Sequence, residues 1–207
     1  LQLTLETADG QARTVTVRKE DWEPLGLTFG PSMTLSPRTC HNHCLFCFID
    51  QMRPGMRDTL YVKDDDWRYS LMMGNFVTLT NVNEAELDRI IRRKASPLYV
   101  SVHTTDPALR CRMMNNRFAG DILARLKRLA EAGIRFHCQI VCCPGYNAGE
   151  ALLRTLRDLR GLAPATLSVA VVPVGLTRYR EGLAQLAPFT REGAQALFRM
   201  LEPFQAE

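Results

Sequence analysis

The sequence lacks an apolar run of the roughly 18 to 20 residues that a membrane-spanning helix requires. Its first ten residues, LQLTLETADG, have the acidic, alternating pattern of a strand and lack the basic and apolar regions of a secretory signal. These absences argue against a membrane-spanning protein and against a secreted one. We therefore expect a cytoplasmic protein without a membrane partner.

The sequence also lacks the paired cysteines of a disulfide scaffold. Its seven cysteines are an odd number, and a chain of this kind without a secretory signal normally keeps its cysteines as thiols. A strong charge of one sign is missing too, because 26 Lys and Arg stand against 22 Asp and Glu, a net charge of +4. The basic residues are scattered and no nucleic-acid recognition motif accompanies them, so we expect them on solvated helix faces.

What is present is typical of an ordered globular domain. The 207 residues are 46% apolar and 23% charged, enough for one sizeable core and unlike a disordered chain. The chain begins at Leu1 without a methionine and ends soon after a helix-like segment. We expect it to be a piece of a longer polypeptide.

Alternating and apolar runs predict the strands. LQLTLET and RTVTVRK flank an Asp9-Gly10 turn and predict a hairpin or the end of a separate sheet. After Gly30-Pro31 the runs become apolar and β-branched, as expected of strands buried on both faces. These predicted strands cover residues 32–36, 76–80, 98–103, 136–142 and 167–174.

Segments with apolar residues at helical spacing lie between and after the strands and predict helices. Asn83 with Glu86 predicts a capping box, while Gly133 and Gly161 predict left-handed helix ends. The helical apolar residues are Leu87, Ile90, Ile91, Ile122, Leu126, Leu129, Leu152, Leu156, Leu159, Leu197, Met200 and Leu201.

This alternation predicts an α/β fold with a parallel sheet. Because parallel crossovers are right-handed, the units build either an open doubly wound sheet or a full or partial barrel, and the pattern does not choose between them. In both arrangements, functional groups gather at the carboxyl ends of the strands.

Cys40, Cys44 and Cys47 follow the first predicted strand as CxxxCxxC, where such chemistry is expected. One interpretation is a core helix with three buried thiols on one face, which Pro37 and the polar 41–43 segment fit poorly. A second is structural zinc with His41 or His43 as the fourth ligand, although zinc usually takes two separated ligand pairs.

The third interpretation is an iron–sulfur cluster, because its irons prefer thiolate sulfur. A four-iron cubane bound by three cysteines keeps one iron free to bind a substrate or cofactor directly. This arrangement explains why the cysteines number three.

The motif resembles the signature of radical S-adenosylmethionine (SAM) enzymes, with the aromatic Phe46 just before Cys47. The string CHNHCLFCFIDQMRPGMRDTLYVKDDDWRYSLMMGNFVTLTN, with QIVCCPGYNAG and VAVVPVGLTRYREGL, is similar to bacterial radical SAM proteins that carry an N-terminal PDZ-like domain and a C-terminal domain of unknown function. The resemblance runs from about Leu25 to Arg191.

The resemblance implies a partial (β/α) TIM-like barrel, preceded here by a short β segment. Residues 1–30 would be the tail of a PDZ-like region and its linker, and residues 31–207 a radical SAM core truncated at its C-terminal end. Cys40, Cys44 and Cys47 would each bind one iron of a [4Fe-4S] cluster, and SAM would chelate the fourth. An electron from the cluster would then cleave SAM to a 5′-deoxyadenosyl radical that abstracts hydrogen from the substrate.

The resemblance also indicates positions for SAM. Where the family has a Gly-Gly-Glu-like segment, this chain has Thr78-Leu79-Thr80-Asn81, so Thr80 and Asn81 would supply oxygen acceptors to the SAM ammonium. Polar residues in otherwise apolar strands are the next candidates, for the SAM carboxylate and ribose. These are Ser101, His103 and Gln139, while the backbone of Val174 and Gly175 would approach adenine.

Two other clusters have simpler interpretations. Asp64-Asp65-Asp66 is expected to be a solvated helix start, where the helix dipole favours negative charge. The competing interpretation is a substrate-side acid or metal group carried by the long insertion between the first two predicted strands. Cys111, Cys138, Cys142 and Cys143 are expected to be core thiols, so no second cluster is predicted.

We expect a radical SAM enzyme that receives electrons from a donor such as flavodoxin or ferredoxin. Its substrate is open among RNA, a peptide and a small molecule, because fold does not determine substrate. The alternatives are a non-catalytic zinc-binding interaction module and an iron–sulfur protein that transfers electrons or senses oxygen.

Overall fold

The computed structural model of the protein describes residues 1–7, 9–27 and 37–205. By its contacts the chain forms two compact units, Leu1–Ser36 and Pro37–Glu207. In the first unit, β1 (Gln2–Glu6) and β2 (Ala12–Thr16) pair antiparallel around a turn at Asp9 and Gly10. The predicted hairpin is confirmed. The strand predicted over 32–36 lies outside the described residues.

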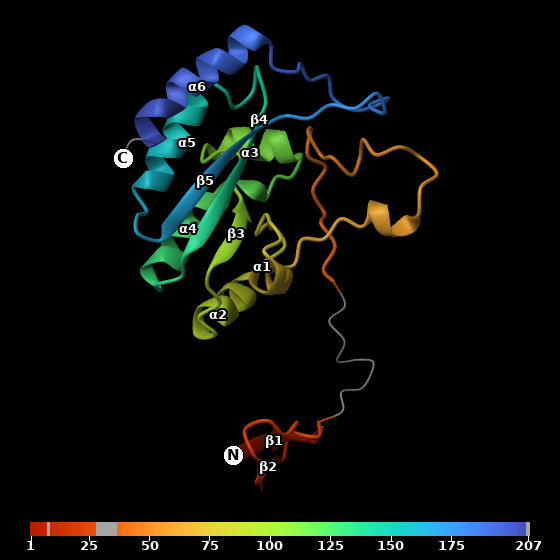
Figure 1. Ribbon diagram of the computed structural model, residues 1–207, viewed down its shortest axis with the longest axis vertical. Coiled ribbons are helices and arrows are strands. Elements are labelled where there is room, and N and C mark those ends of the chain that lie inside the picture. The colour runs from red at the N-terminus through yellow and green to blue at the C-terminus, as the bar shows by residue number, and fades with distance from the viewer. Residues whose placement is uncertain (8, 28–36, 206–207) are drawn as a thin grey trace. The chain divides into compact units, whose positions relative to one another are not determined.

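The second unit alternates strands and helices (Figure 1). β3, β4 and β5 form a parallel sheet in that order, which confirms the predicted α/β fold. The helices predicted from apolar spacing are α2, α4, α5 and α6. The start of α1 was predicted from the acidic run alone, and α3 was not predicted. The elements are η2 (Asp58–Tyr61), α1 (Trp67–Met73), α2 (Glu84–Arg92), β3 (Leu98–Ser101), α3 (Pro107–Met114), η3 (Ala119–Asp121), α4 (Ile122–Glu131), β4 (Phe136–Cys142), α5 (Glu150–Arg160), β5 (Thr166–Pro173) and α6 (Arg191–Gln205).

The two faces of this sheet have different surroundings. Along β4, every second side chain from Phe136 to Cys142 is buried in a core that α2, α4 and α5 complete. The alternate side chains Gln139 and Val141 are half-buried and line a cavity. The prediction of strands buried on both faces is therefore wrong for β4. It is also wrong for β5, where Leu167 and Val172 are 40% and 39% exposed.

The predicted strand over 76–80 is reduced to one parallel bridge, Val77 opposite Val100. Directly after this bridge, side chains bind the backbone groups that would otherwise form hydrogen bonds with a neighbouring strand. The backbone N–H of Thr78 donates to Asp65 Oδ1 over 2.6 Å, and the Thr78 carbonyl accepts from Arg110 Nη2 over 3.0 Å. Leu79 then turns into the left-handed region with φ of 61°. The chain leaves the sheet because its polar backbone groups already have partners.

Arg110 of α3 connects the carboxyl ends of the 76–80 segment and of β3 by hydrogen bonds. Its guanidinium is 1% exposed and donates to four backbone carbonyls and to no carboxylate among the described residues. The acceptors are Val102 at 2.9 Å, Ala119 at 2.5 Å, Thr78 at 3.0 Å and Ser101 at 2.9 Å. Burial is the main cause that lowers the pKa of Arg110, to about 10, so it still carries its charge at neutral pH.

The acidic run is a helix start, but it is not solvated as predicted. Asp66 is the N-cap of α1 and accepts from the backbone N–H of Arg68. Asp65 and Asp66 are only 1% and 0% exposed. Their burial is compensated because Thr78 donates to Asp65, while Arg68 and the backbone of Arg38 donate to Asp66.

The other predicted helix ends are confirmed in part. Asn83 is the N-cap of α2 and its Oδ1 accepts from the backbone N–H of Glu86 over 2.9 Å, but the Glu86 carboxylate contacts Trp67, Arg38 and Arg89 instead of completing the predicted capping box. Gly133 has φ of 78° after α4, as predicted. Gly161 instead has φ of −62°, so the left-handed end predicted there is wrong. No helix of the described residues is long and apolar enough to cross a membrane.

The thiols outside the CxxxCxxC motif are largely core residues, as expected. Cys138, Cys142 and Cys143 are at most 1% exposed. Cys111 differs, because it is half-buried and its Sγ lies 3.5 Å from the Arg117 carbonyl oxygen.

Replacing Arg110 with methionine is expected to destabilise the protein by about 3 to 5 kcal/mol, because buried carbonyls lose a charged donor. The free energy of unfolding from urea titration measures this. Arg154→Met is the matched control. The Arg154 ion pair with Asp106 is 56% and 34% exposed, so its loss is expected to cost about 0 to 1 kcal/mol. Equal costs for the two variants would contradict this account of Arg110.

Candidate functional site

The three cysteines of the motif lie on one cavity of about 530 Å³ in the second unit. Its other walls come from the carboxyl ends of β3, β4 and β5, from residues 62–64, and from Asn75, Phe76 and Thr78. The site is therefore at the strand ends, where the sequence predicted it. The lining residues include Cys40, Cys44, Phe46, Cys47, Lys63, Asp64, Asn75, Thr78, Ser101, His103, Gln139, Val141, Pro173 and Gly175.

The segment that carries the cysteines, residues 38–51 (the cysteine loop), forms turns and no helix or strand. Its start pairs with the segment before α1. Thr39 forms an antiparallel bridge with Asp64, the Cys40 N–H donates to the Lys63 carbonyl over 2.8 Å, and the Asp65 N–H donates to the Arg38 carbonyl.

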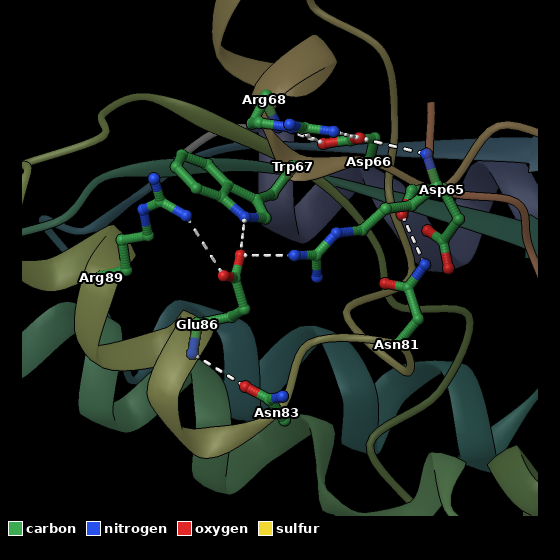
Figure 2. A network of polar contacts seen from close by, with 9 residues as sticks. Asp65, Asp66, Trp67, Arg68, Asn81, Asn83, Glu86 and Arg89 are labelled. Atoms are coloured by element: carbon green, nitrogen blue, oxygen red, sulfur yellow. Dashed lines mark hydrogen bonds and ion pairs between the residues drawn. The ribbon is translucent and has the colours of Figure 1, made fainter. Parts of the chain in front are cut away.

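Glu86 of α2 reinforces this start (Figure 2). Its carboxylate accepts from Trp67 Nε1 over 2.8 Å and forms ion pairs with Arg38 and Arg89. These contacts lower the pKa of Glu86, with the Trp67 hydrogen bond as the largest cause. The network connects the first residue of the cysteine loop to α1 and α2.

The middle of the cysteine loop is attached to the C-terminal end of α3. The backbone N–H groups of His43 and Leu45 donate to the carbonyls of Met114 and Met113. Phe46 packs in a small core with Met113, Cys143 and Val174. Its ring lies edge-on to that of His103, with 4.5 Å between the ring centroids. The aromatic residue before the last cysteine is thus an anchor for the loop.

Gln51 attaches the end of the cysteine loop to the segment after β5. Its amide donates to the Gly175 carbonyl and accepts from the Thr177 N–H, both over 3.0 Å. Arg180 donates to Gln51 Oε1 and to the Leu45 carbonyl. Hydrogen bonds to three separate parts of the fold therefore fix the loop.

Burial raises the pKa of all three thiols, and raises that of Cys44 to about 12. The Cys40 and Cys47 sulfurs raise the pKa of Cys44 further, because three negative thiolates would repel one another. Arg110 acts in the opposite direction on Cys44. All three cysteines are free of disulfides.

Lys63 adds a positive charge to the cavity wall. Its Nζ lies 2.5 Å from Asp50 Oδ1, at the end of the cysteine loop. Burial opposes its charge, but the hydrogen bond to Asp50 and the nearby sulfurs of Cys47 and Cys40 together raise the pKa of Lys63. An anionic group bound between the cysteines would gain from this charge.

Four of the predicted SAM-binding residues line the cavity with the cysteines: Ser101, His103, Gln139 and Gly175. Ser101 and Gln139 are paired neighbours on β3 and β4. The Gly175 carbonyl is already bonded to Gln51, and Val174 is buried against Phe46 instead of facing the cavity.

Thr80 and Asn81 are not among the described residues that line the cavity. Thr80 Oγ1 contacts the Asn42 amide and Thr78, a neighbour that does line it. Asn81 Nδ2 donates to the Asp65 carbonyl over 2.7 Å (Figure 2), while its Oδ1 is buried without a hydrogen-bond partner among the described residues.

His103 is a neutral hydrogen-bonding group. The Val141 N–H donates to its Nδ1 over 3.2 Å, so the ring proton is on Nε2. Burial, together with the charge of Arg110, lowers the pKa of His103 to about 3. Its backbone has φ of 63°, in the left-handed region. His103 therefore offers its Nε2–H as a donor, while its Nδ1 lone pair is taken by the Val141 N–H.

The histidines considered as zinc ligands are placed differently. The side chains of His41 and His43 are exposed and do not line the cavity. Among the described residues, no three His, Cys, Asp or Glu side chains are gathered so that they would hold a single metal ion.

The sequence did not single out several residues that build this site. Asn42 lies between two cysteines, and the two-residue period of a strand places Thr78 on the same face as the predicted Thr80, which was a usable signal for Thr78. Arg110 and Gln51 are fixed by contacts with residues distant in the chain, such as Thr78 and Gly175, and these have no local pattern.

Comparison with known proteins gives one family. The model of the Radical SAM-like domain matches residues 19–169, well over half of the chain. No curated protein matches the sequence significantly. The predicted partial (β/α) barrel, preceded by a β hairpin, agrees with this match.

Two solved structures resemble the chain. A domain of pyruvate-formate lyase-activating enzyme from Bacteroides vulgatus has a TM-score of 0.47 and 17% identity, covering 63% of this chain and 76% of that chain. SuiB from Streptococcus suis has a TM-score of 0.47 and 13% identity, covering 63% of this chain and 28% of that chain.

The buried neutral state of His103 has a consequence for stability. Its pKa is lower in the folded chain than the ordinary 6.5, so the unfolded chain binds a proton first and stability falls as pH drops below about 6.5. From about pH 7 to pH 5 this loss is roughly 2 kcal/mol.

The variant His103→Asn is expected to lose less stability over the same pH range than the wild type. Asparagine keeps an acceptor for the Val141 N–H and tolerates the left-handed backbone. Urea titrations at both pH values measure the difference. Identical losses in the two proteins would contradict a neutral buried His103.

Proposed function

Because the chain belongs to the family of radical SAM-like domains, we propose that it is a radical SAM enzyme that binds a [4Fe-4S] cluster through Cys40, Cys44 and Cys47. The observation that carries the proposal is the shared cavity, where three free thiols meet the polar ends of β3 and β4. When bound, the cluster and SAM supply the reductive cleavage of SAM to methionine and a 5′-deoxyadenosyl radical, which takes hydrogen from a substrate.

The residues present fit such a group. Thiolate sulfur is the ligand that iron–sulfur clusters prefer, and three of the four irons of a cubane would find a cysteine. The cavity of about 530 Å³ is within the usual range for small-molecule and cofactor sites. Lys63 and the buried Arg110 supply positive charge beside thiolates that would otherwise repel one another.

The polar wall supports binding of SAM next to the cysteines. Ser101 and Gln139 face the cavity, and we assign them to the SAM carboxylate and ribose hydroxyls. The neutral His103 offers its Nε2–H as a further donor. We assign the backbone of Gly175, which lines the same cavity, to adenine.

Asn81 is assigned to the SAM ammonium. Its Oδ1 is a buried acceptor without a partner among the described residues, which is a reason to expect a donor from a ligand. Thr80, which contacts Thr78 of the cavity wall, would assist it. Both assignments need a small rearrangement, because neither residue lines the cavity.

The wider setting is part of the same proposal. An electron donor such as flavodoxin or ferredoxin would reduce the cluster in the cytoplasm, and RNA, a peptide or a small molecule would be the substrate. We also assign the chain to the bacterial radical SAM proteins that carry a PDZ-like region in front, to which residues 1–30 would belong, and a domain of unknown function behind.

The proposal is tested with protein purified and reconstituted without oxygen. It is expected to be brown, to contain iron and sulfide, and to form 5′-deoxyadenosine from SAM and dithionite. A colourless protein with one zinc would contradict the proposal, and a brown protein that never forms 5′-deoxyadenosine would indicate electron transfer or sensing instead.

Substitution of the motif is expected to remove the cluster. Cys44→Ala should lose most of the iron and sulfide and all detectable 5′-deoxyadenosine. Cys111→Ala is the matched control, because the Cys111 thiol is half-buried and does not line the cavity. It should keep wild-type iron content, and a comparable iron loss in both variants would argue against the motif as the ligand set.

A further inference from the structure

The side chain of Asn42 lies against the sulfur of Cys40. Its Nδ2 is 3.3 Å from Cys40 Sγ, and the residue is only 2% exposed. The same Nδ2 is 3.2 Å from Thr78 Oγ1 and 2.9 Å from Thr80 Oγ1. The amide thus directs its N–H groups toward one sulfur and two hydroxyl oxygens.

The orientation of this amide follows from a chain of hydrogen bonds that begins at a backbone group. The Phe118 N–H can only donate, and it lies 2.9 Å from Asn116 Oδ1. The other end of the Asn116 amide must therefore be its Nδ2, which donates to Asn42 Oδ1 over 2.6 Å. Because the oxygen of Asn42 faces Asn116, its Nδ2 must face Cys40.

The neighbouring hydroxyl groups agree with this orientation. Thr78 Oγ1 is 2.5 Å from Asp65 Oδ2, a carboxylate oxygen, so the Thr78 hydroxyl donates there. Its lone pairs remain to accept from Asn42. Both the oxygen and the nitrogen of the buried Asn42 amide therefore have hydrogen-bond partners. The flipped amide would place its oxygen, which cannot donate, against Cys40 Sγ.

The three cysteines of the motif differ in this respect. Cys40 receives hydrogen bonds from both the backbone and the side-chain amide of Asn42, whereas those at Cys47 come from the backbone of Asp50 and Ile49. Cys44 has the charge of Arg110 nearby. The side-chain donor to Cys40 is uncharged. A substitution of Asn42 therefore removes this hydrogen bond without changing the backbone or the charge of the site.

We propose that Asn42 donates an N–H···S hydrogen bond to Cys40 as a cluster ligand and thereby raises the reduction potential of the cluster. This inference rests on the proposed function. A hydrogen bond to a ligating sulfur stabilises the more negative, reduced state, so it makes reduction easier. Asn42 acts through Cys40 and is a positioning residue, with Asn116 fixing its orientation.

The test compares midpoint potentials of reconstituted full-chain proteins by redox titration monitored with electron paramagnetic resonance (EPR), without SAM. Asn42→Leu keeps the size of the side chain and removes the donor, so its potential is expected to shift to more negative values. Thr80→Val is the matched control, because it removes a contact of the same amide and leaves the sulfur contact. Its potential is expected not to fall.

A second measurement uses the wild type, so that poor cluster assembly in Asn42→Leu does not decide the question. Protein grown with asparagine labelled with ¹⁵N in the side chain is expected to show a ¹⁵N coupling in pulsed EPR of the reduced cluster. The coupling should be weaker in Asn116→Leu, in which the amide is no longer fixed.

The outcomes separate the two proposals. A wild-type cluster without ¹⁵N coupling, or an Asn42→Leu cluster with unchanged potential, overturns the role of Asn42 and leaves the radical SAM function standing. A wild type that assembles no cluster overturns both. A merely structural role of Asn42 would lower the amount of cluster without moving its potential.

Discussion

The cysteine loop has no helix or strand of its own, so the position of its three thiols depends on hydrogen bonds from the surrounding fold. Its start pairs with the segment before α1, its middle binds the last turn of α3, and Gln51 attaches its end to the segment after β5. An irregular segment fixed at three places can therefore present three sulfurs to one cavity without a helix or strand of its own.

Charge is the second constraint on this site. Burial raises the pKa of the three thiols, which favours their protonated forms in the absence of metal. Iron binds thiolates, so assembly of a cluster must release protons and becomes less favourable as pH falls. The buried Arg110, whose guanidinium also joins Thr78, Ser101 and Val102, offsets part of this cost at Cys44. One residue thus contributes to both the fold and the electrostatics of the cavity.

The sequence predicted what depends on periodicity and on local chemistry. Strand β4, the helices with apolar spacing, the Asn83 cap and the N-terminal hairpin are confirmed because each follows from neighbours in the chain. The strand over 76–80 failed because Asp65 and Arg110, distant in sequence, take the backbone groups of Thr78. Asp65 and Asp66 were expected in solvent for the same reason, since their donors Thr78 and Arg38 come from other segments.

For the site, composition and spacing located the three cysteines, and the structure places Ser101, His103, Gln139 and Gly175 on the same cavity. No sequence pattern predicts the hydrogen bond between the side-chain amides of Asn116 and Asn42, because the two residues are 74 positions apart. The central claim is that a cluster on Cys40, Cys44 and Cys47 has one iron open to SAM. The most direct measurement is the EPR spectrum of the reduced, reconstituted protein with SAM labelled with ¹⁷O or ¹⁵N in its methionine part. The account predicts a changed spectrum with coupling to the label, and an identical spectrum with and without SAM would contradict it.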